Sequence, residues 1–131
     1  MAIADRHGLP IAVRVTSASP NESTLVEDTL GQRHVSALPE RLIGDRAYDS
    51  DRLDQRLRDE HGVELIAPNR RRRRRSQDGR PLRRYLRRWK IERLFAWLKN
   101  YRRISSPWER HAQNFLGMVQ LACALILLRH L

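Results

Sequence analysis

The stretch YLRRWKIERLFAWLK, residues 85–99, repeats both its polar and its apolar residues at helical spacing. At about 100 degrees per residue, one polar set falls within a sector of about 60 degrees: Tyr85, Arg88, Glu92 and Lys99. A neighbouring apolar face can pack on a sheet: Ile91, Leu94, Phe95 and Leu98. The stretch therefore predicts a helix, from Leu82 to about Arg103, that holds a polar stripe at the edge of a core.

This spacing alone fits two interpretations. An ordinary amphipathic helix would also pair Arg88 with Glu92 at i, i+4, which contributes only about 0.3–0.5 kcal/mol on an exposed surface. A functional helix would instead use the stripe to aim the Glu92 carboxylate with cations beside it. The spacing by itself does not choose between them.

Short β-rich runs come before this helix. Residues 2–5 and 9–16 predict a hairpin with Gly8 in its turn, and residues 41–44 predict a buried strand that leads into Asp45. The other expected elements are a strand over 63–67 and helices over 24–30, 50–60 and 112–131. Strands come first and long helices last, which predicts an α/β (α+β) domain with a mixed sheet and helices packed on it.

Residues 69–80 contain no apolar side chain and include six consecutive arginines: Arg70, Arg71, Arg72, Arg73, Arg74 and Arg75. A segment with nothing to bury is expected to be a loop or a solvated arm within the one domain of residues 1–131. The run either adds affinity for the DNA backbone or is only a solvated run of charge, and composition leaves both interpretations open.

The whole chain is strongly basic. Its 26 Lys and Arg residues against 15 Asp and Glu give a formal charge of +11 over 131 residues. Such a field attracts polyanions, so nucleic acid leads the list of partners. One cysteine excludes an internal disulfide, and the five histidines show no metal-ligand spacing. With no secretory leader at its start, the chain is expected in the cytoplasm.

Apolar residues of the C-terminal part are expected to form its core. The stretch 112–128 is uncharged and borderline in length for a membrane span, but Gln113, Asn114 and Gln120 interrupt it. We therefore expect a buried helix and no membrane partner. The three tryptophans are expected in the core rather than stacked on a DNA base: Trp89, Trp97 and Trp108.

Two blocks at fixed spacing resemble the IS4 and IS5 superfamily of insertion-sequence transposases. The residues from Tyr85 to Lys99 fill every position of its Tyr-x2-Arg-x3-Glu-x6-Lys (YREK) signature. Gly44-Asp45-Arg46-Ala47-Tyr48 resembles its second-aspartate block, Asp-x-(Gly or Ala)-(Tyr or Phe). Residues 4–10, 16–21 and 114–116 look like the hairpin and the last helix of the same family. Over its length the chain thus resembles the C-terminal catalytic part of an IS5-family DDE transposase.

This resemblance implies an RNase H-like fold that cleaves and joins DNA strands at insertion-sequence ends. It assigns Asp45 and Glu92 as catalytic residues and as ligands of divalent ions, Mg2+ or Mn2+. Carboxylate oxygens suit such ions, and two ions can activate the attacking oxygen and stabilise the leaving oxygen. Tyr85, Arg88 and Lys99 are expected to bind DNA phosphates beside the scissile bond.

One carboxylate of the family pattern has no counterpart in the sequence. The first aspartate of the family lies on an opening strand, in an Asp-Gly-Thr or Asp-Ser-Thr context, and neither triplet occurs here. Asp5 resembles a later family aspartate, although a rival interpretation makes Asp5 the first ligand. We therefore expect the first strand to be missing and the isolated chain to be inactive. An N-terminal half from an upstream reading frame, and a homodimer of the complete protein, are the expected partners.

Two other classes of protein compete with an active enzyme. A catalytically dead remnant would use the same basic face only as a DNA-binding module. An RNA-binding protein of ribosomal type would explain the charge but not the spaced Tyr85, Arg88, Glu92 and Lys99. Metal-dependent nicking of DNA separates the enzyme from both, whereas salt-sensitive binding does not.

Overall fold

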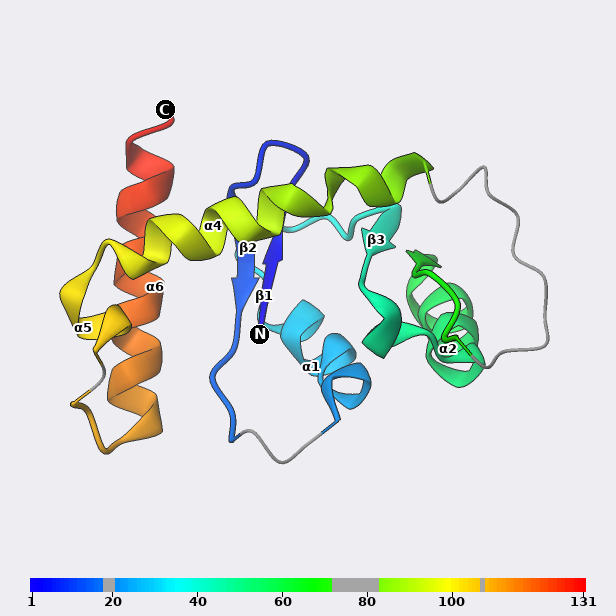
Figure 1. The fold of residues 1–131 in the computed structure, drawn as a ribbon, viewed down its shortest axis with the longest axis horizontal. Helices are drawn as coiled ribbons and strands as arrows, with labels where there is room; N and C mark the ends of the chain where they lie inside the picture. The colour runs from blue at the N-terminus through cyan, green and yellow to red at the C-terminus, as the bar shows by residue number, and fades with distance from the viewer. Residues whose placement is uncertain (18–20, 72–82, 107) are drawn as a thin grey trace.

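The N-terminal residues form a hairpin in the computed structural model, which describes residues 1–17, 21–71, 83–106 and 108–131 (Figure 1). Strand β1 (Ala2–Ala4) pairs antiparallel with β2 (Pro10–Val13). Pairing continues one residue further, because the Arg14 N–H donates to the Met1 carbonyl at 2.9 Å. The predicted hairpin is confirmed, with a second strand shorter than the expected 9–16.

A parallel strand pair with a crossover helix follows. Strand β3 (Arg41–Ile43) lies beside β4 (Glu64–Ile66), and helix α2 (Asp51–His61) connects them. The Ser50 hydroxyl caps the start of α2 by accepting from the Leu53 N–H at 3.4 Å. Gly62 ends the helix in the left-handed conformation with φ +66°. The strands predicted over 41–44 and 63–67 and the helix over 50–60 are confirmed, but the first strand is not buried as expected, because Arg41 is exposed and Leu42 and Ile43 are only half-buried.

The first of two apolar cores forms where short helices pack against α2 and the strands that it connects. The 3-10 turn η1 (Glu22–Thr24) leads into α1 (Val26–Gly31), and the 3-10 turn η2 (Arg46–Tyr48) follows β3. Buried side chains of α1, of α2 and of the residue just before β4 make this core: Val26, Leu30, Leu53, Leu57 and Val63. The loop that begins at Gly44 thus lies between a strand and a helix whose Leu53 and Leu57 are buried in this core.

The C-terminal helices form the second core with the hairpin. The order is the 3-10 helix η3 (Arg83–Arg88), α4 (Trp89–Lys99), α5 (Arg102–Ser105) and α6 (Ala112–Leu128). Leu94 and Leu98 of α4 are buried against β2 and α6, together with Val13, Val119, Ala122, Cys123 and Ile126. In the described parts of the chain we find no helix with both the length and the apolarity to cross a membrane.

The α/β class is confirmed, and two details of the prediction are wrong. The described strands form two separate pairs, β1–β2 and β3–β4, rather than one mixed sheet. The helix expected up to Arg103 is also interrupted, because Tyr101 is extended (φ −88°, ψ 111°) and the chain turns there into α5. This turn lets α5 and α6 pack back against α4.

The expectation of three core tryptophans is wrong for Trp89 and Trp108, whereas Trp97 is partly buried and packs against the second core. Trp89 is half exposed, and Trp108 is 93% exposed. Trp89 and Trp97 instead flank the Arg93 guanidinium, whose Cζ lies 4.8 Å and 4.9 Å from their ring centroids. The charged group beside the Trp89 ring keeps that ring at the surface of α4.

Candidate active site

Tyr85, Arg88 and Glu92 form one hydrogen-bonded group on the surface. The Arg88 Nη1 donates to the Tyr85 hydroxyl at 2.8 Å, and its Nη2 donates to Glu92 Oε1 at 2.9 Å. Backbone geometry explains the spacing of three and then four. In a 3-10 helix such as η3 side chains three apart eclipse, whereas in α4 side chains four apart are neighbours. The change of helix type at Arg88 therefore aligns all three side chains.

The guanidinium of Arg88 is the positive centre of this group. Its hydrogen bond to Glu92 is the largest of the interactions that raise the pKa of Arg88 above its ordinary value, and Tyr85 adds to it. Its Cζ also lies 5.5 Å from the centroid of the Tyr85 ring. Arg88 and Glu92 remain substantially exposed, at 41% and 59% of their side chains. A phosphate from solution can therefore reach the Arg88 cation.

Helix α4 is held from two sides. Its buried side, Leu94 and Leu98, packs in the core. Beside the polar group, the Lys90 Nζ donates to the Arg6 carbonyl and the Arg93 Nη2 donates to the His7 carbonyl, which fixes the hairpin turn to the helix. Glu92 is thus presented by a helix anchored to both the core and the hairpin.

Asp45 lies at the C-terminal end of β3, where it caps the turn η2. Its Oδ1 accepts from the Ala47 N–H at 2.8 Å. Tyr48 packs over the preceding Gly44 so closely that a Cβ there would lie 2.8 Å from the Tyr48 Cδ2. The order Gly-Asp-x-x-Tyr therefore has a local reason. The glycine leaves room for the tyrosine ring, and the aspartate caps the turn that places the ring there.

Tyr48 in turn ties this loop to the N-terminal part of the fold. Burial is the main cause that raises the pKa of Tyr48 above its ordinary value, followed by the charge of Glu22 and a hydrogen bond to it. The charge of Asp45 raises that pKa further. The phenol stays protonated at neutral pH and holds η2 against η1.

Arg70, the first arginine of the run, folds back onto the Asp45 turn. Its Nη2 and Nε donate to the carbonyls of Ala47 and Arg46, at 3.0 and 3.3 Å. Its backbone N–H donates to Asp49 Oδ2 at 2.8 Å. Arg71 is exposed. The other predicted DNA-binding arginines lie outside the described residues: Arg72, Arg73, Arg74 and Arg75.

The structure brings together only part of the predicted site. Lys99 is exposed at the last turn of α4, seven residues beyond Glu92, or about 10 Å along the helix. β3, the strand that leads to Asp45, lies against η3, the helix that leads to Glu92. Among the described residues no hydrogen bond joins Asp45 to Glu92, since the first contacts Ala47 and the second Arg88.

Asp5, the rival candidate for the first ligand, has a role within the hairpin. Its Oδ1 accepts from the His7 and Leu9 N–H groups, both at 2.8 Å. The backbone of the turn is closed by the Gly8 N–H, which donates to the Asp5 carbonyl at 3.0 Å. The Asp5 carboxylate therefore organises the turn that α4 holds.

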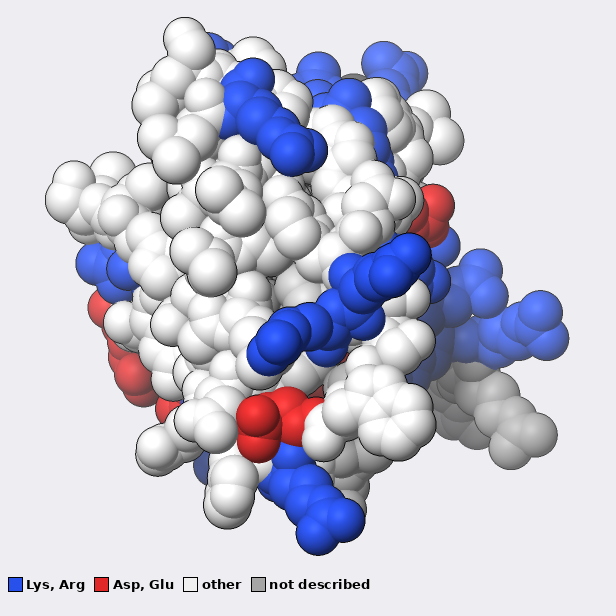
Figure 2. Space-filling model, turned by 90° about the vertical axis from the view of Figure 1, so that its left-hand side faces the viewer, with Lys and Arg blue, Asp and Glu red and all other residues white. Residues whose placement is uncertain are grey.

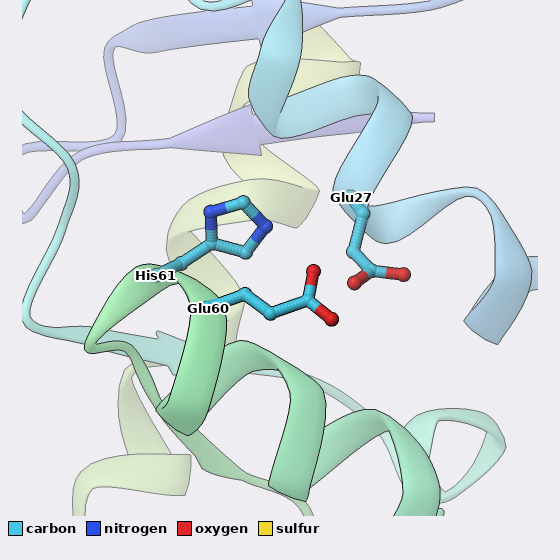
Figure 3. Close-up of side chains that lie close together, drawn as sticks. All are labelled: Glu27, Glu60 and His61. Carbon is cyan, nitrogen blue, oxygen red and sulfur yellow. The ribbon is translucent and has the colours of Figure 1, made fainter.

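A second group of side chains that could bind a metal ion is not indicated by any pattern in the sequence. Glu27 of α1 and Glu60 and His61 of α2 have ligand atoms within 4.8 Å of one another, as Figure 3 shows. It is the one group of three or more such residues in the described ranges. Because α1 and α2 are brought together only by tertiary packing, no spacing of residues in the sequence predicts this group. Glu27 Oε2 is already paired with Arg56 Nη2 at 2.5 Å, so the group has a cation of its own.

Comparison with known proteins identifies the chain. A family model described as a transposase DDE domain matches residues 1–127. The chain is 33% identical over 132 residues to a protein of Burkholderia cepacia named as a transposase for insertion sequence element IS402; that match covers 95% of the chain and 59% of the relative. It is also 33% identical over 135 residues to a protein of Brucella ovis named as a transposase for insertion sequence element IS6501, covering 98% and 95% of the two.

The chain therefore spans less than two thirds of the first relative and nearly all of the second. No solved structure matches it. Its helices and small sheets are consistent with the RNase H-like architecture that the resemblance implies. With a family model matched over almost its whole length, the chain belongs to the transposase DDE domain family.

Proposed function

We propose that this chain carries catalytic carboxylates of a transposase that cleaves and joins DNA strands at insertion-sequence ends. The observation that carries the proposal is the Tyr85–Arg88–Glu92 group. A carboxylate, a guanidinium and a phenol meet on one exposed face of an anchored helix. Those are an oxygen ligand for a hard cation and two donors for a phosphate.

Asp45 and Glu92 are the proposed ligands of Mg2+ or Mn2+. Each carboxylate uses one oxygen internally, Asp45 Oδ1 for Ala47 and Glu92 Oε1 for Arg88. Asp45 Oδ2 and Glu92 Oε2 have no hydrogen-bond partner among the described residues, so both can offer a hard oxygen. When bound, such ions would polarise a phosphodiester and the oxygen that attacks it.

The remaining residues of the stripe would position the DNA strand. Arg88 can exchange its exposed contact with Glu92 for a charge-assisted contact with a phosphate. Tyr85 can donate its hydroxyl to the same phosphate while its ring supports the guanidinium. Lys99, about 10 Å further along the helix, would contact a more distant phosphate of the strand. Arg70 to Arg75 would add backbone affinity.

We further propose that another strand, with a third carboxylate, completes the site. In the described residues β1 and β3 each pair on one side only, within separate two-stranded sheets. Open strand edges favour pairing with a further strand, and in Figure 1 β1 and β3 are the inner strands of the two pairs. Such a strand would come from an N-terminal half encoded upstream. Asp5 Oδ1 accepts two hydrogen bonds within its own turn, and we propose that this carboxylate serves the hairpin rather than the metal site.

The test is a cleavage assay on DNA that carries the ends of the insertion sequence, with Mg2+ or Mn2+. We expect no nicking by the 131-residue chain alone, and metal-dependent nicking when the N-terminal half is added in trans or is fused to it. A remnant that only binds DNA would bind in both cases and nick in neither. Nicking by the isolated chain, abolished by Asp5→Asn, would overturn the proposed third carboxylate.

A further inference from the structure

The segment that leaves β4 returns to the turn that carries Asp45. Strands β3 and β4 are parallel, with Ile43 paired to Ile66, so the segments that follow them leave from the same edge of the pair. This pairing continues one residue past β3, because the Gly44 N–H donates to the Ile66 carbonyl at 3.0 Å. Arg70, only a few residues beyond β4, therefore lies beside η2, the turn that follows Asp45.

Arg70 contacts η2 with one edge of its guanidinium. The Nε and Nη2 atoms form this edge, and they donate to the carbonyls of Arg46 and Ala47 at 3.3 and 3.0 Å. The Arg70 N–H donates to Asp49 Oδ2 at 2.8 Å, so the backbone of Arg70 is held by the residue that ends the turn. Basic side chains near the end of a helix can donate to its last carbonyls. Arg70 does so for η2 from a distant part of the sequence.

Ala47 connects this contact to the Asp45 carboxylate. The Ala47 carbonyl accepts from Arg70 Nη2, and the Ala47 N–H donates to Asp45 Oδ1 at 2.8 Å. Movement of the Ala47 backbone would therefore rotate the carboxylate with it. Because Asp45 Oδ1 is used in this bond, the direction of Oδ2, the oxygen proposed for the metal ion, depends on where η2 is held.

We propose that Arg70 is a positioning residue for Asp45, which holds η2 so that Asp45 Oδ2 keeps the direction in which it meets a metal ion. The inference rests on the proposed function, because it takes Asp45 as a ligand. In this role Arg70 touches neither the ion nor the scissile bond, and it acts through the carbonyls of Arg46 and Ala47. Residues that orient a metal ligand typically contribute about tenfold to a hundredfold in metal affinity or activity.

The shape of the Arg70 side chain, rather than its charge, distinguishes this role from the backbone affinity proposed for the arginine run. Positive charge is spread over the molecule, and Figure 2 shows several basic side chains on the side where α6 lies. Attraction to DNA phosphates needs only charge, which a lysine also supplies. The contact with η2 needs two donors held in one plane, which a guanidinium has and an ammonium lacks. The substitution Arg70→Lys therefore separates the two roles.

The first test is NMR relaxation of the backbone amides in the 131-residue chain, without DNA or metal. We expect the Ala47 N–H to be rigid in the wild type, with an order parameter of about 0.85, and to fall towards about 0.6 in Arg70→Lys. Arg52→Lys is the matched control, because Arg52 is an exposed arginine of α2. The other amides of α2 should stay rigid in both variants, which shows that both fold. An Ala47 N–H that is equally rigid in Arg70→Lys would overturn the proposal.

The second test is strand cleavage by the complete transposase at saturating DNA, over a series of Mn2+ concentrations. We expect Arg70→Lys to slow cleavage by at least about tenfold and to raise the Mn2+ concentration that gives half the maximal rate, because a misdirected carboxylate binds the ion more weakly. Affinity for DNA should change by less than about threefold, since the charge is kept. Arg52→Lys should cleave like wild type.

Two results of this assay would overturn the role of Arg70. One is cleavage by Arg70→Lys at the wild-type rate with the same need for Mn2+. The other is a loss that appears only in DNA affinity and vanishes at saturating DNA, because Arg70 would then act on DNA alone. A complete wild-type transposase that does not cleave would instead count against the proposed function. In that case the mobility of the Ala47 N–H still decides whether Arg70 holds the Asp45 turn.

Discussion

Arg88 donates to the Glu92 carboxylate across 2.9 Å, so the proposed phosphate-binding cation and the proposed metal ligand are each other's partners before DNA arrives. An exposed pair of this kind contributes only about 0.3–0.5 kcal/mol. A phosphate can therefore break it at little cost. The Arg88–Glu92 pair occurs in any amphipathic helix with this spacing, and it is equally compatible with a site whose side chains rearrange when DNA binds.

Replacement of Arg88 by alanine should separate stability from DNA binding. We expect the free energy of unfolding in urea to change by less than about 0.5 kcal/mol, and DNA affinity at low salt to fall by about tenfold, because a charge-assisted contact is lost. Arg58→Ala is the matched control, since Arg58 makes an i, i+4 pair with Asp54 at 3.2 Å on α2. Equal losses of affinity in both variants would show that only net charge matters.

Binding to duplex DNA should be tight at low salt, depend weakly on sequence and fall steeply as salt rises. Each phosphate contact contributes about −0.9 to the slope of log affinity against log salt. Replacing residues 71–75 with serine, while keeping Arg70 on the Asp45 turn, should make the slope shallower by about one to four. Fluorescence anisotropy over a salt series measures it. An unchanged slope would assign the run to something other than DNA.

Gly8, in the turn of the hairpin, should tolerate substitution poorly. It has φ +81°, and a Cβ there would lie 2.7 Å from Arg93 Nη2 and 3.2 Å from the Lys90 carbonyl oxygen. We expect Gly8→Ala to lower the free energy of unfolding by about 1–3 kcal/mol. Gly31→Ala, at the end of α1 with open space around it, should change it by less than about 1 kcal/mol. Similar losses in the two variants would mean that the hairpin does not dock on α4 as described.

The Cys123 thiol should make stability depend on alkaline pH. Burial raises its pKa to about 11 from 9.0, so the folded state favours the neutral thiol. The stabilisation of the folded state by the neutral thiol is complete below pH 9.0 and is lost as pH rises towards about 11. In that window the thiol ionises only in the unfolded chain. Wild type should therefore lose stability more steeply than Cys123→Ala, by urea unfolding at several pH values. Parallel losses in the two proteins would place the thiol in contact with water.

The elements could be predicted because their signals are local. Alternation of apolar residues and a glycine in the turn predict the hairpin, and a serine cap and a glycine stop bound α2. The stripe from Tyr85 to Glu92 was also predictable, since its residues lie within eight positions of one another on the consecutive helical segments η3 and α4. Even there the change from 3-10 to α-helix at Arg88 came only from the structure, because no residue pattern distinguishes the two helix types over one turn.

Features that depend on tertiary packing could not be predicted. The contact of Arg70 with the Asp45 turn joins residues more than twenty positions apart. Two separate strand pairs replaced the expected mixed sheet, because a sequence pattern says where strands lie but not which edges meet. Trp89 resembled a core residue by size, whereas its position beside Arg93 keeps it at the surface. The approach of Asp45 to Glu92 stays a prediction for the same reason.

The most direct test of the central claim is the rate of metal-dependent strand cleavage by the complete transposase carrying Glu92→Gln. The substitution removes a charged ligand and keeps the shape of the side chain. We expect cleavage to fall by at least about a hundredfold, as it should for Asp45→Asn, while affinity for end-bearing DNA changes by less than about threefold. Glu40→Gln, which alters an exposed glutamate outside the site, should cleave like wild type. Metal-dependent cleavage retained by Glu92→Gln would contradict the assignment of Glu92 as a catalytic ligand.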